Sequence, residues 1–427
     1  MPEAPLAPGA PSRAEEQVSG GWAGPLAAII LLQTSAAFLL QLLPVLAPLM
    51  AGRFGWDRGV IGYLTATTMA SAIFCLLASS PFVRRLGPIR TVQAALLLGT
   101  VAAALLFMPF WLAPIAASVL IGIAYAPATP GGGEVLQRFA PRRHRSLVFS
   151  IKQAGVPAGG AVAGFLVPLV AEWGGWDAAV VLALALLLTA VLLAQLFRGR
   201  ADAHRDPRAP LSAATVLTLR NLLLPLQALR AGSRLLPLTG VATGLALGQG
   251  TLNSFLVTYL VVGLGIDLRT AGATFAVMQA GGVAGRVLLG WLADRIGSGL
   301  AVIRLATVGS AASMLALASV KPDWPHPLLY GLGFLAGSVV AGWNGVLLAE
   351  VARRAPAGRV GEASAGSAIL MFTGFVLGPA AFAGILTTGG SFAAGLLVLA
   401  AVPCAALVAS LVWLPVGRRR AQETGRA

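Results

Sequence analysis

Apolar residues occur along the whole chain in long runs, separated by short polar segments that carry arginine. About 20 consecutive apolar residues suffice for a helix to cross the hydrocarbon core of a bilayer. Glycine and proline inside such runs are no objection, because membrane helices tolerate both. The pattern predicts twelve spans, over about 24–50, 59–80, 91–110, 112–137, 146–171, 177–197, 236–262, 270–292, 299–320, 327–350, 362–387 and 391–415.

Composition supports the same fold class. Hydrophobic residues make up 57% of the 427 residues and charged residues only 11%, whereas soluble domains carry about 25% charged residues. Cys75 and Cys404 both fall inside apolar runs, where cysteine behaves as a small hydrophobic residue, so no disulfide is predicted. The chain is therefore expected to be an all-α polytopic membrane protein embedded in a lipid bilayer.

The basic residues indicate how the chain is oriented. Of the 30 lysines and arginines, 23 lie in the segments on one side of the predicted spans and four on the other. Positively charged loops remain in the cytoplasm, so both termini are expected to be cytoplasmic, in the inner membrane of a bacterium. The net charge of +15 could also suit nucleic acid, but the clustering between spans argues against such a partner.

Five segments are expected. Residues 1–22 are rich in proline, alanine and glutamate and are predicted to be a disordered cytoplasmic tail. A six-helix bundle over 23–198 and a second over 235–415 follow, joined by a cytoplasmic linker over 199–234, with a basic tail over 416–427. The linker contains an amphipathic stretch that could lie on the membrane surface, although a solvated tether is the favoured interpretation.

The two bundles are related by sequence. Gly55-Trp56-Asp57 recurs as Gly265-Ile266-Asp267, and the same offset relates Arg85-Leu86-Gly87 to Arg295-Ile296-Gly297. Six spans therefore appear twice in the same orientation. Parallel repeats of this kind place a substrate site between the halves, near the middle of the membrane, with access alternating between the two sides.

A short motif after the eighth span adds a family resemblance. Gly290, Asp294, Arg295 and Gly297 form Gly-x-x-x-Asp-Arg-x-Gly, which resembles the loop signature of the major facilitator superfamily. Together with twelve spans, a basic linker and the repeat, the resemblance extends over about 24–415 and implies a secondary transporter with two parallel six-helix repeats.

The first-half copy of the motif departs from the family, because Arg84 stands where aspartate is usual. Its gating charge network is therefore expected to be missing or to have moved to the second half. The residues expected in gating or in the loop motif are Gly290, Asp294, Arg295, Gly297, Arg85, Gly87, Glu134 and Glu350.

Two cations lie inside predicted spans at similar depth. Lys152 is seven residues past Arg145, and Arg286 is eight residues before Asp294, which is roughly 10 Å into the membrane at 1.5 Å per residue. The resemblance implies that the fifth and eighth spans meet beside the cavity. Two cations at one cavity repel each other unless an anion lies between them, and arginine offers a planar fork that suits a carboxylate. The sequence predicts an organic-anion site.

Structural roles are the alternatives for both residues. Arg286 could cap backbone carbonyls or pair with Asp294, and Lys152 could reach the cytoplasmic surface or pair with Glu134. The chain has 28 arginines and only two lysines, so a lysine within the membrane is unusual here. Arg304 is expected to extend towards the membrane surface. No aspartate or glutamate is predicted near mid-membrane, so proton coupling is either absent or travels with the substrate.

Uncharged polar groups complete the predicted substrate site, although each is individually more often an interhelical hydrogen-bonding group than a ligand. They are Gln33, Gln153, Gln249, Asn253, Gln279, Tyr125, Asn344 and Thr373.

The resulting hypothesis is a monomeric secondary transporter that moves a small organic anion by alternating access. The alternative within transport is a drug or metabolite exporter of the same superfamily. A membrane enzyme or a non-transporting sensor are further classes, but the sequence has no nucleophile–base pair, no metal-spaced histidine cluster and no Gly-x-x-x-x-Gly-Lys phosphate loop. No catalytic residue, metal or cofactor is predicted.

Overall fold

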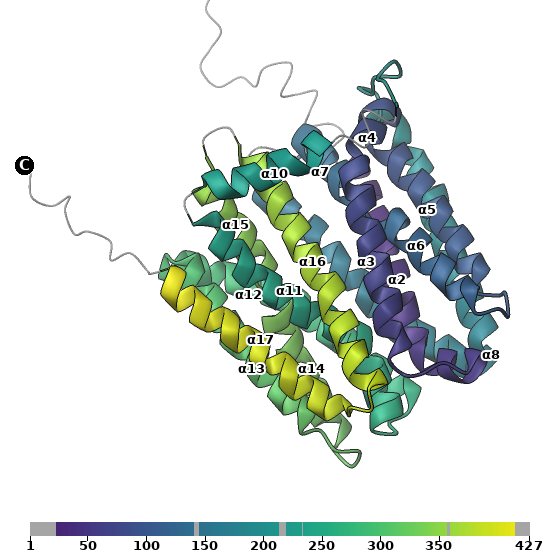
Figure 1. Cartoon of the computed structure of the whole chain (residues 1–427). Helices are drawn as coiled ribbons and strands as arrows, with labels where there is room; N and C mark the ends of the chain where they lie inside the picture. Colours follow the sequence, from purple (N-terminus) through teal and green to yellow (C-terminus); the bar gives the residue numbers. More distant parts are fainter. Residues whose placement is uncertain (1–22, 141–144, 213–218, 233, 357–358, 415–427) are drawn as a thin grey trace, which may run out of the picture.

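The computed structural model describes residues 23–140, 145–212, 219–232, 234–356 and 359–414, and every regular element within these ranges is a helix (Figure 1). The first half contains α2 (Ala23–Phe54), α3 (Val60–Ala78), α4 (Ser80–Leu86), α5 (Pro88–Leu105), α6 (Leu112–Tyr125), α7 (Ala128–Phe139) and α8 (Arg145–Ala201). Helix α10 (Leu219–Ala231) lies in the linker. The second half contains α11 (Leu235–Thr258) with a π-helical end η2 (Tyr259–Gly263), α12 (Leu268–Ile296), α13 (Gly299–Ala318), α14 (His326–Val340), α15 (Asn344–Arg354), α16 (Val360–Thr387) and α17 (Phe392–Trp413).

Eleven helical stretches in the described part of the chain are long and apolar enough to cross a membrane. One of them, Ile151–Ala201, has 51 residues and is interrupted by non-helical backbone at Gly174 and Gly175. Gly175 has φ 67°, in the left-handed region that glycine adopts without steric cost. This stretch is therefore the fifth and sixth spans, and the predicted twelve spans are confirmed.

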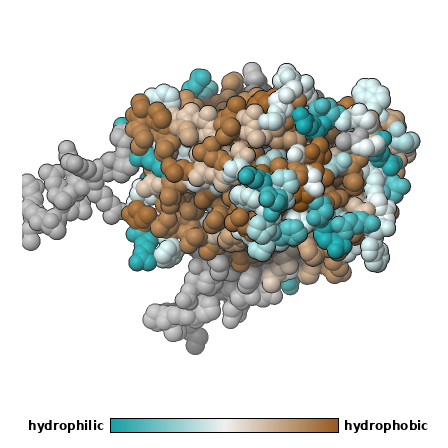
Figure 2. All heavy atoms as spheres, turned by 90° about the horizontal axis from the view of Figure 1, so that it is seen from below, coloured by the Kyte–Doolittle hydropathy of each residue, from teal (hydrophilic) through white to brown (hydrophobic). Residues whose placement is uncertain are grey.

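The halves lie side by side (Figure 1), and α8 packs against α12, α3 against α16 and α2 against α11. The end of the molecule that carries α10 is called here the linker side, and the opposite end the far side. Helix α10 lies across the linker side and packs against α16 and α11. Hydrophobic side chains cover much of the face in view in Figure 2, and outward residues such as Trp173 and Leu196 are largely exposed, as lipid-facing residues are.

The halves are held together on the far side. Arg269 forms an ion pair with Glu172 across the interface at 2.5 Å. The Arg58 Nη2 donates a hydrogen bond to the Gly390 carbonyl of the other half at 3.3 Å. Gly164 and Gly272 face each other so closely that a Cβ on either would meet the other's backbone. Close glycine contacts let helix backbones approach, so the two halves pack tightly against each other on the far side.

Candidate functional site

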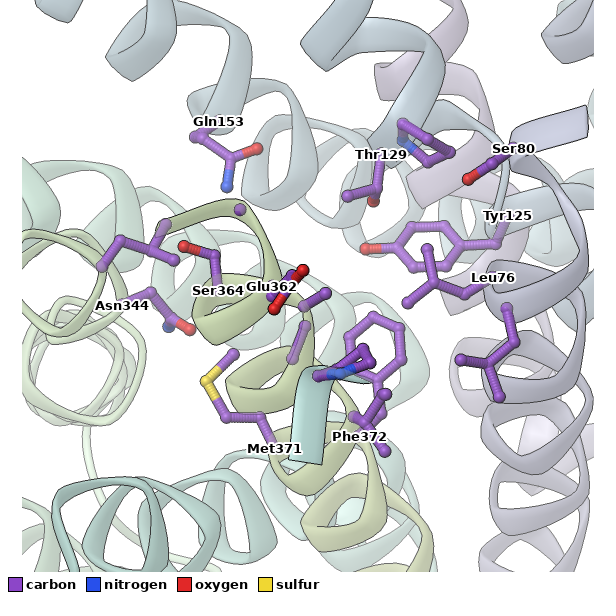
Figure 3. Close-up of a pocket in the computed structure, with 18 of the residues that line it drawn as sticks. Leu76, Ser80, Tyr125, Thr129, Gln153, Asn344, Glu362, Ser364, Met371 and Phe372 are labelled. Carbon is purple, nitrogen blue, oxygen red and sulfur yellow. The ribbon is translucent and has the colours of Figure 1, made fainter. Parts of the chain in front are cut away.

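A cavity of about 860 Å³ lies between the halves and extends to the linker side. Its walls come from α2, α3, α4, α6, α7 and α8 of the first half and from α11, α12, α15 and α16 of the second. Linker residues, including Leu224 and Pro225 of α10, form part of its rim. Arg84 and Glu362 line the cavity from opposite halves near the linker side. Figure 3 shows part of this lining.

The structure brings seven of the ten predicted substrate residues to this cavity: Gln33, Tyr125, Lys152, Gln153, Gln249, Arg286 and Asn344. The other three do not line it. Gln279 is buried where α12 packs against Gly160 of α8. The Thr373 hydroxyl donates to the Ile369 carbonyl at 3.0 Å within α16. Asn253 is half-buried on α11.

Lys152 is fully buried, with an exposed fraction of 2%. Its ammonium nitrogen lies 3.3 Å from the Gln153 Oε1, a neutral acceptor. Gly132 of α7 provides the space for its end, because a Cβ there would lie 2.5 Å from the Lys152 Cε. The alternative pairing with Glu134 does not occur, since Glu134 binds Arg138 at 2.6 Å. Among the described residues, Lys152 has no ion-pair partner.

Arg286 joins the halves through backbone carbonyls. Its Nη1 donates to the Gln153 carbonyl of α8 at 2.5 Å, and its Nε donates to the Ala341 carbonyl at 3.3 Å. The ion pair with Asp294 considered from the sequence is not formed, whereas carbonyl capping is. Within the described ranges, the remaining nitrogen, Nη2, has no partner. The guanidinium is therefore fixed in place while one of its edges stays available at the cavity.

Amides surround the two cations. The Asn344 Nδ2 donates to the Gln249 Oε1 at 3.3 Å and to the Ala341 carbonyl at 3.0 Å. The Gln33 Oε1 is buried and has no hydrogen-bond partner among the described residues. Because a buried acceptor without a partner is unfavourable, Gln33 is a group that a bound molecule could satisfy.

The rest of the wall is largely apolar. Leu76 of α3, Met371 and Phe372 of α16 and the Tyr125 ring of α6 lie around one space in Figure 3. Phe372 and Phe375 pack together with ring centroids 6.0 Å apart. The cavity thus combines a cationic, amide-rich region with an aromatic wall, which suits a molecule with one anionic end and an apolar body.

The second-half loop motif is built around a helix end. Gly297 has φ 69° and terminates α12, with its N–H donating to the Ala293 carbonyl. The Arg295 guanidinium lies 5.2 Å from the centre of the Trp291 ring. Asp294 is exposed. Glu350 is buried, and it accepts hydrogen bonds from Arg353 at 2.6 Å and Arg354 at 3.0 Å.

The first-half copy is tied to the linker instead. The Arg84 carbonyl accepts from the Asp206 N–H at 2.9 Å, and the Arg84 guanidinium lies 3.7 Å from the Asp206 carboxylate. The Arg85 Nη1 donates to the Ala209 carbonyl at 3.4 Å. With arginine at position 84, the acidic partner in this loop comes from the linker.

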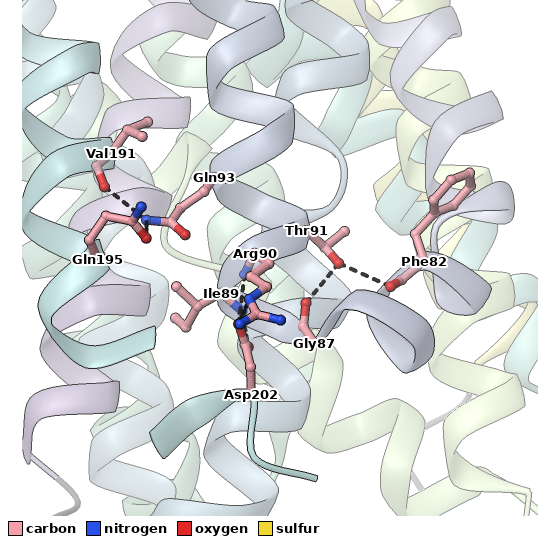
Figure 4. Close-up of polar contacts among 9 residues, drawn as sticks. All are labelled: Phe82, Gly87, Ile89, Arg90, Thr91, Gln93, Val191, Gln195 and Asp202. Carbon is pink, nitrogen blue, oxygen red and sulfur yellow. Dashed lines mark hydrogen bonds and ion pairs between the residues drawn. The ribbon is translucent and has the colours of Figure 1, made fainter. Parts of the chain in front are cut away.

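Asp202, which sequence reasoning missed, anchors this arrangement (Figure 4). Its carboxylate accepts from the Ile89 N–H at 2.9 Å and the Arg90 N–H at 3.1 Å, so it caps α5. Gly87 has φ 96°, and a Cβ there would lie 2.5 Å from the Asp202 Cγ. Burial raises the pKa of the Asp202 carboxyl to about 6, outweighing the opposing hydrogen bond from Ile89. Gly87-Pro88 indicates the start of a helix whose N-cap residue has no side chain that could accept a hydrogen bond. Nothing in the sequence indicates which distant residue supplies the capping group.

Comparisons with known proteins agree with this architecture. A sequence profile described as Major Facilitator Superfamily matches residues 28–344 and 241–427. The chain is 28% identical over 277 residues to a 4-hydroxybenzoate transporter, PcaK, from Pseudomonas aeruginosa, covering 58% of this chain and 61% of the relative. It is 27% identical over 286 residues to a gallate transporter from Pseudomonas putida, covering 60% and 62%. The matches thus span less than two thirds of either relative.

Solved structures show the same fold. The nucleoside transporter NupG aligns with a TM-score of 0.74 and 14% identity, covering 92% of this chain and 100% of NupG. The human organic anion transporter MFSD10 aligns with a TM-score of 0.66 and 16% identity, covering 91% and 99%. At such identities the likeness concerns the fold alone.

Proposed function

The chain belongs to the major facilitator superfamily, and from that premise we propose that it transports a small organic anion with a carboxylate group by alternating access. The observation that carries the proposal is the presence of Lys152 and Arg286 in one cavity between the halves. Neither side chain has an ion-pair partner among the described residues. A carboxylate bound between them would offset their repulsion and take up the donors that they leave available.

The remaining lining supports a substrate with an aromatic or apolar body. The rings of Tyr125, Phe372 and Phe375 can pack against such a body through their faces and edges. The side-chain amides that line the cavity can donate hydrogen bonds to polar substituents of the substrate or accept hydrogen bonds from them. The names of the relatives, a 4-hydroxybenzoate transporter and a gallate transporter, favour aromatic monocarboxylates as the first compounds to test.

The distribution of basic residues supports a proposal for the orientation of the protein in the membrane. We propose that the linker side is cytoplasmic and that both termini lie there, because 23 of the 30 basic residues are in segments on that side. The cavity of this structure would then face the cytoplasm of a bacterium, across its inner membrane. We further propose that a monomer operates as two six-helix units, 23–198 and 235–415, joined by the linker 199–234. The motif residues of both halves would act in closing the linker side.

Ligand-dependent thermal stability of the purified protein tests the substrate proposal. A ligand that binds the folded state stabilises it by about 2.7 kcal/mol at a concentration of 100 times Kd. We expect 4-hydroxybenzoate or gallate to raise the Tm of the wild type, and Lys152→Ala and Arg286→Ala to remove the rise. Arg200→Ala is the control for loss of a basic residue, since Arg200 is exposed at the end of the sixth span and lies outside the cavity.

The drug-exporter alternative makes the opposite prediction. An apolar cation would raise the Tm of all four proteins, and the carboxylates would have no effect on any of them. That outcome would assign Lys152 and Arg286 a structural role.

A further inference from the structure

Lys152 is buried to an extent that no other basic residue matches in the described part of the chain. Its single hydrogen-bond partner there is the neutral Gln153 amide, 3.3 Å away. Burying a cation without a counter-charge is costly. An amine avoids that cost by giving up its proton, whereas it regains the proton favourably when an anion comes to lie beside it.

The choice of lysine at this position is informative. The chain uses arginine at 28 of its 30 basic positions, yet it has lysine at its most buried described one. A guanidinium stays protonated in proteins, whereas a lysine amine can exchange its proton. Arg286, held by two carbonyls in the same cavity, therefore supplies a permanent charge. The two cations of the site have different chemistry.

The groups that face Lys152 do not neutralise its charge. Helix α2 contributes the neutral Gln33, and α6 contributes Tyr125. On α7, Glu134 is paired with Arg138, and on α16 Glu362 is paired with Arg359 at 2.6 Å. Helix α12 contributes Arg286, whose charge has the same sign as an ammonium. The neighbourhood of Lys152 thus favours a counter-anion that comes from outside the chain.

Building on the proposed function, we propose that Lys152 carries the proton that is coupled to substrate movement. In this cycle Lys152 of the empty cavity releases its proton to the solution and becomes an amine. A monocarboxylate enters together with one proton from the same solution, and the proton binds the Lys152 Nζ to give an ammonium–carboxylate pair. On the other side the carboxylate leaves, and the amine returns the proton to solution.

Charge balances in this cycle. Arg286 contributes one positive charge throughout, and the proton added to Lys152 offsets the negative charge of the carboxylate. Empty and loaded cavities therefore carry the same net charge. Transport of a monocarboxylate would consume a pH gradient and would be insensitive to the membrane potential.

Proton uptake on binding tests the inference directly. In weakly buffered detergent solution with a pH-sensitive dye, at a series of values from about pH 7 to about pH 8.5, we expect the wild type to take up protons when it binds 4-hydroxybenzoate, with an uptake per bound molecule that rises towards one as the pH increases. Lys152→Arg keeps the charge but removes the exchangeable proton, so it should bind with little or no uptake. Arg200→Lys is the control for an arginine–lysine change elsewhere. Binding by the wild type without proton uptake would overturn the inference.

Transport in proteoliposomes gives a second test that separates coupling from binding. With the membrane potential clamped, an inward proton gradient should drive the wild type to accumulate labelled 4-hydroxybenzoate inside the vesicles. Lys152→Arg should still exchange internal for external substrate, but it should not accumulate the substrate in response to the proton gradient. Equal accumulation by both proteins would overturn the inference. If the wild type exchanges neither 4-hydroxybenzoate nor gallate, the proposed function itself fails for these probes, and the inference falls with it. If Lys152→Arg is inactive in exchange, the proton-uptake experiment on the wild type tests the inference alone: uptake on binding supports it, and binding without uptake overturns it.

Discussion

Gly132 determines whether the Lys152 side chain has room beside the fourth span. A Cβ at this position would lie 2.5 Å from the Lys152 Cε and 3.0 Å from its Nζ, so the flexible end of Lys152 would have to move away from α7. The neighbouring Gly133 has open space around its own Cβ position. The two glycines therefore form a matched pair for testing the position of the ammonium group.

We expect Gly132→Ala to displace Lys152 and to weaken 4-hydroxybenzoate binding by roughly tenfold, equivalent to about 1.4 kcal/mol. Gly133→Ala should leave the affinity unchanged. Titration by calorimetry of both purified variants and the wild type measures the difference. Equal Kd values for the two variants would show that the space beside Gly132 does not matter for the site.

Asp202 provides a pH-dependent prediction, because its folded-state pKa of about 6 exceeds the unfolded value of about 3.9. Between these values the folded protein binds more protons than the unfolded chain, so this residue makes stability decrease as the pH rises from about 4 to about 6. Above that window its contribution is constant.

We expect the Tm difference between Asp202→Asn and the wild type to move in favour of the variant as the pH increases through that window. Thermal unfolding in detergent at a series of pH values measures it. Asp206→Asn, which removes a less buried carboxylate of the same segment, controls for loss of charge. A Tm difference for Asp202→Asn that is independent of pH contradicts the account of its burial.

At the scale of elements, the apolar runs were enough to predict the twelve spans, because length and hydropathy alone determine what can cross a bilayer. Even the division of the 57-residue α8 follows from Gly174-Gly175. The sequence also placed Lys152 and Arg286 at matching depth, because rise per residue is constant along a helix.

The sequence was not enough to predict which polar residues of the spans line the cavity. Gln249 and Asn253 are one helical turn apart on α11, yet only Gln249 lines the cavity. That difference depends on how neighbouring helices are rotated and packed, which hydropathy does not encode. The contact between Asp202 and Ile89 joins residues 113 positions apart and is likewise invisible to local patterns.

The two halves of the molecule are in contact on the far side, and the cavity between them extends to the linker side. Alternating access therefore requires the far-side contacts to break. The Arg269–Glu172 pair spans the halves and has side-chain exposures of 60% and 34%. Exposed pairs of this kind contribute at most about 1 kcal/mol. Its loss should therefore shift the balance between the two conformations moderately rather than completely.

We expect Glu172→Gln to increase access to the cavity from the far side by up to about fivefold, the equivalent of 1 kcal/mol. Labelling of Gln249→Cys by an impermeant maleimide, in a background with Cys75→Ser and Cys404→Ser, measures that access. Reversing the pair with Glu172→Arg and Arg269→Glu should restore it. Asp177→Asn is the control, because Asp177 pairs with Arg53 at 3.7 Å within one half. If Glu172→Gln and Asp177→Asn change the labelling rate equally, the gating role of the Arg269–Glu172 pair is contradicted.

The central claim is that Lys152 and Arg286 together hold a carboxylate that the protein carries across the membrane. Counterflow of labelled 4-hydroxybenzoate into proteoliposomes preloaded with unlabelled compound tests it most directly, because the assay needs no driving gradient. The account predicts counterflow by the wild type and by Arg200→Ala, and its loss in folded Lys152→Ala and Arg286→Ala. Counterflow that persists in both cavity variants at the rate of the wild type would contradict it.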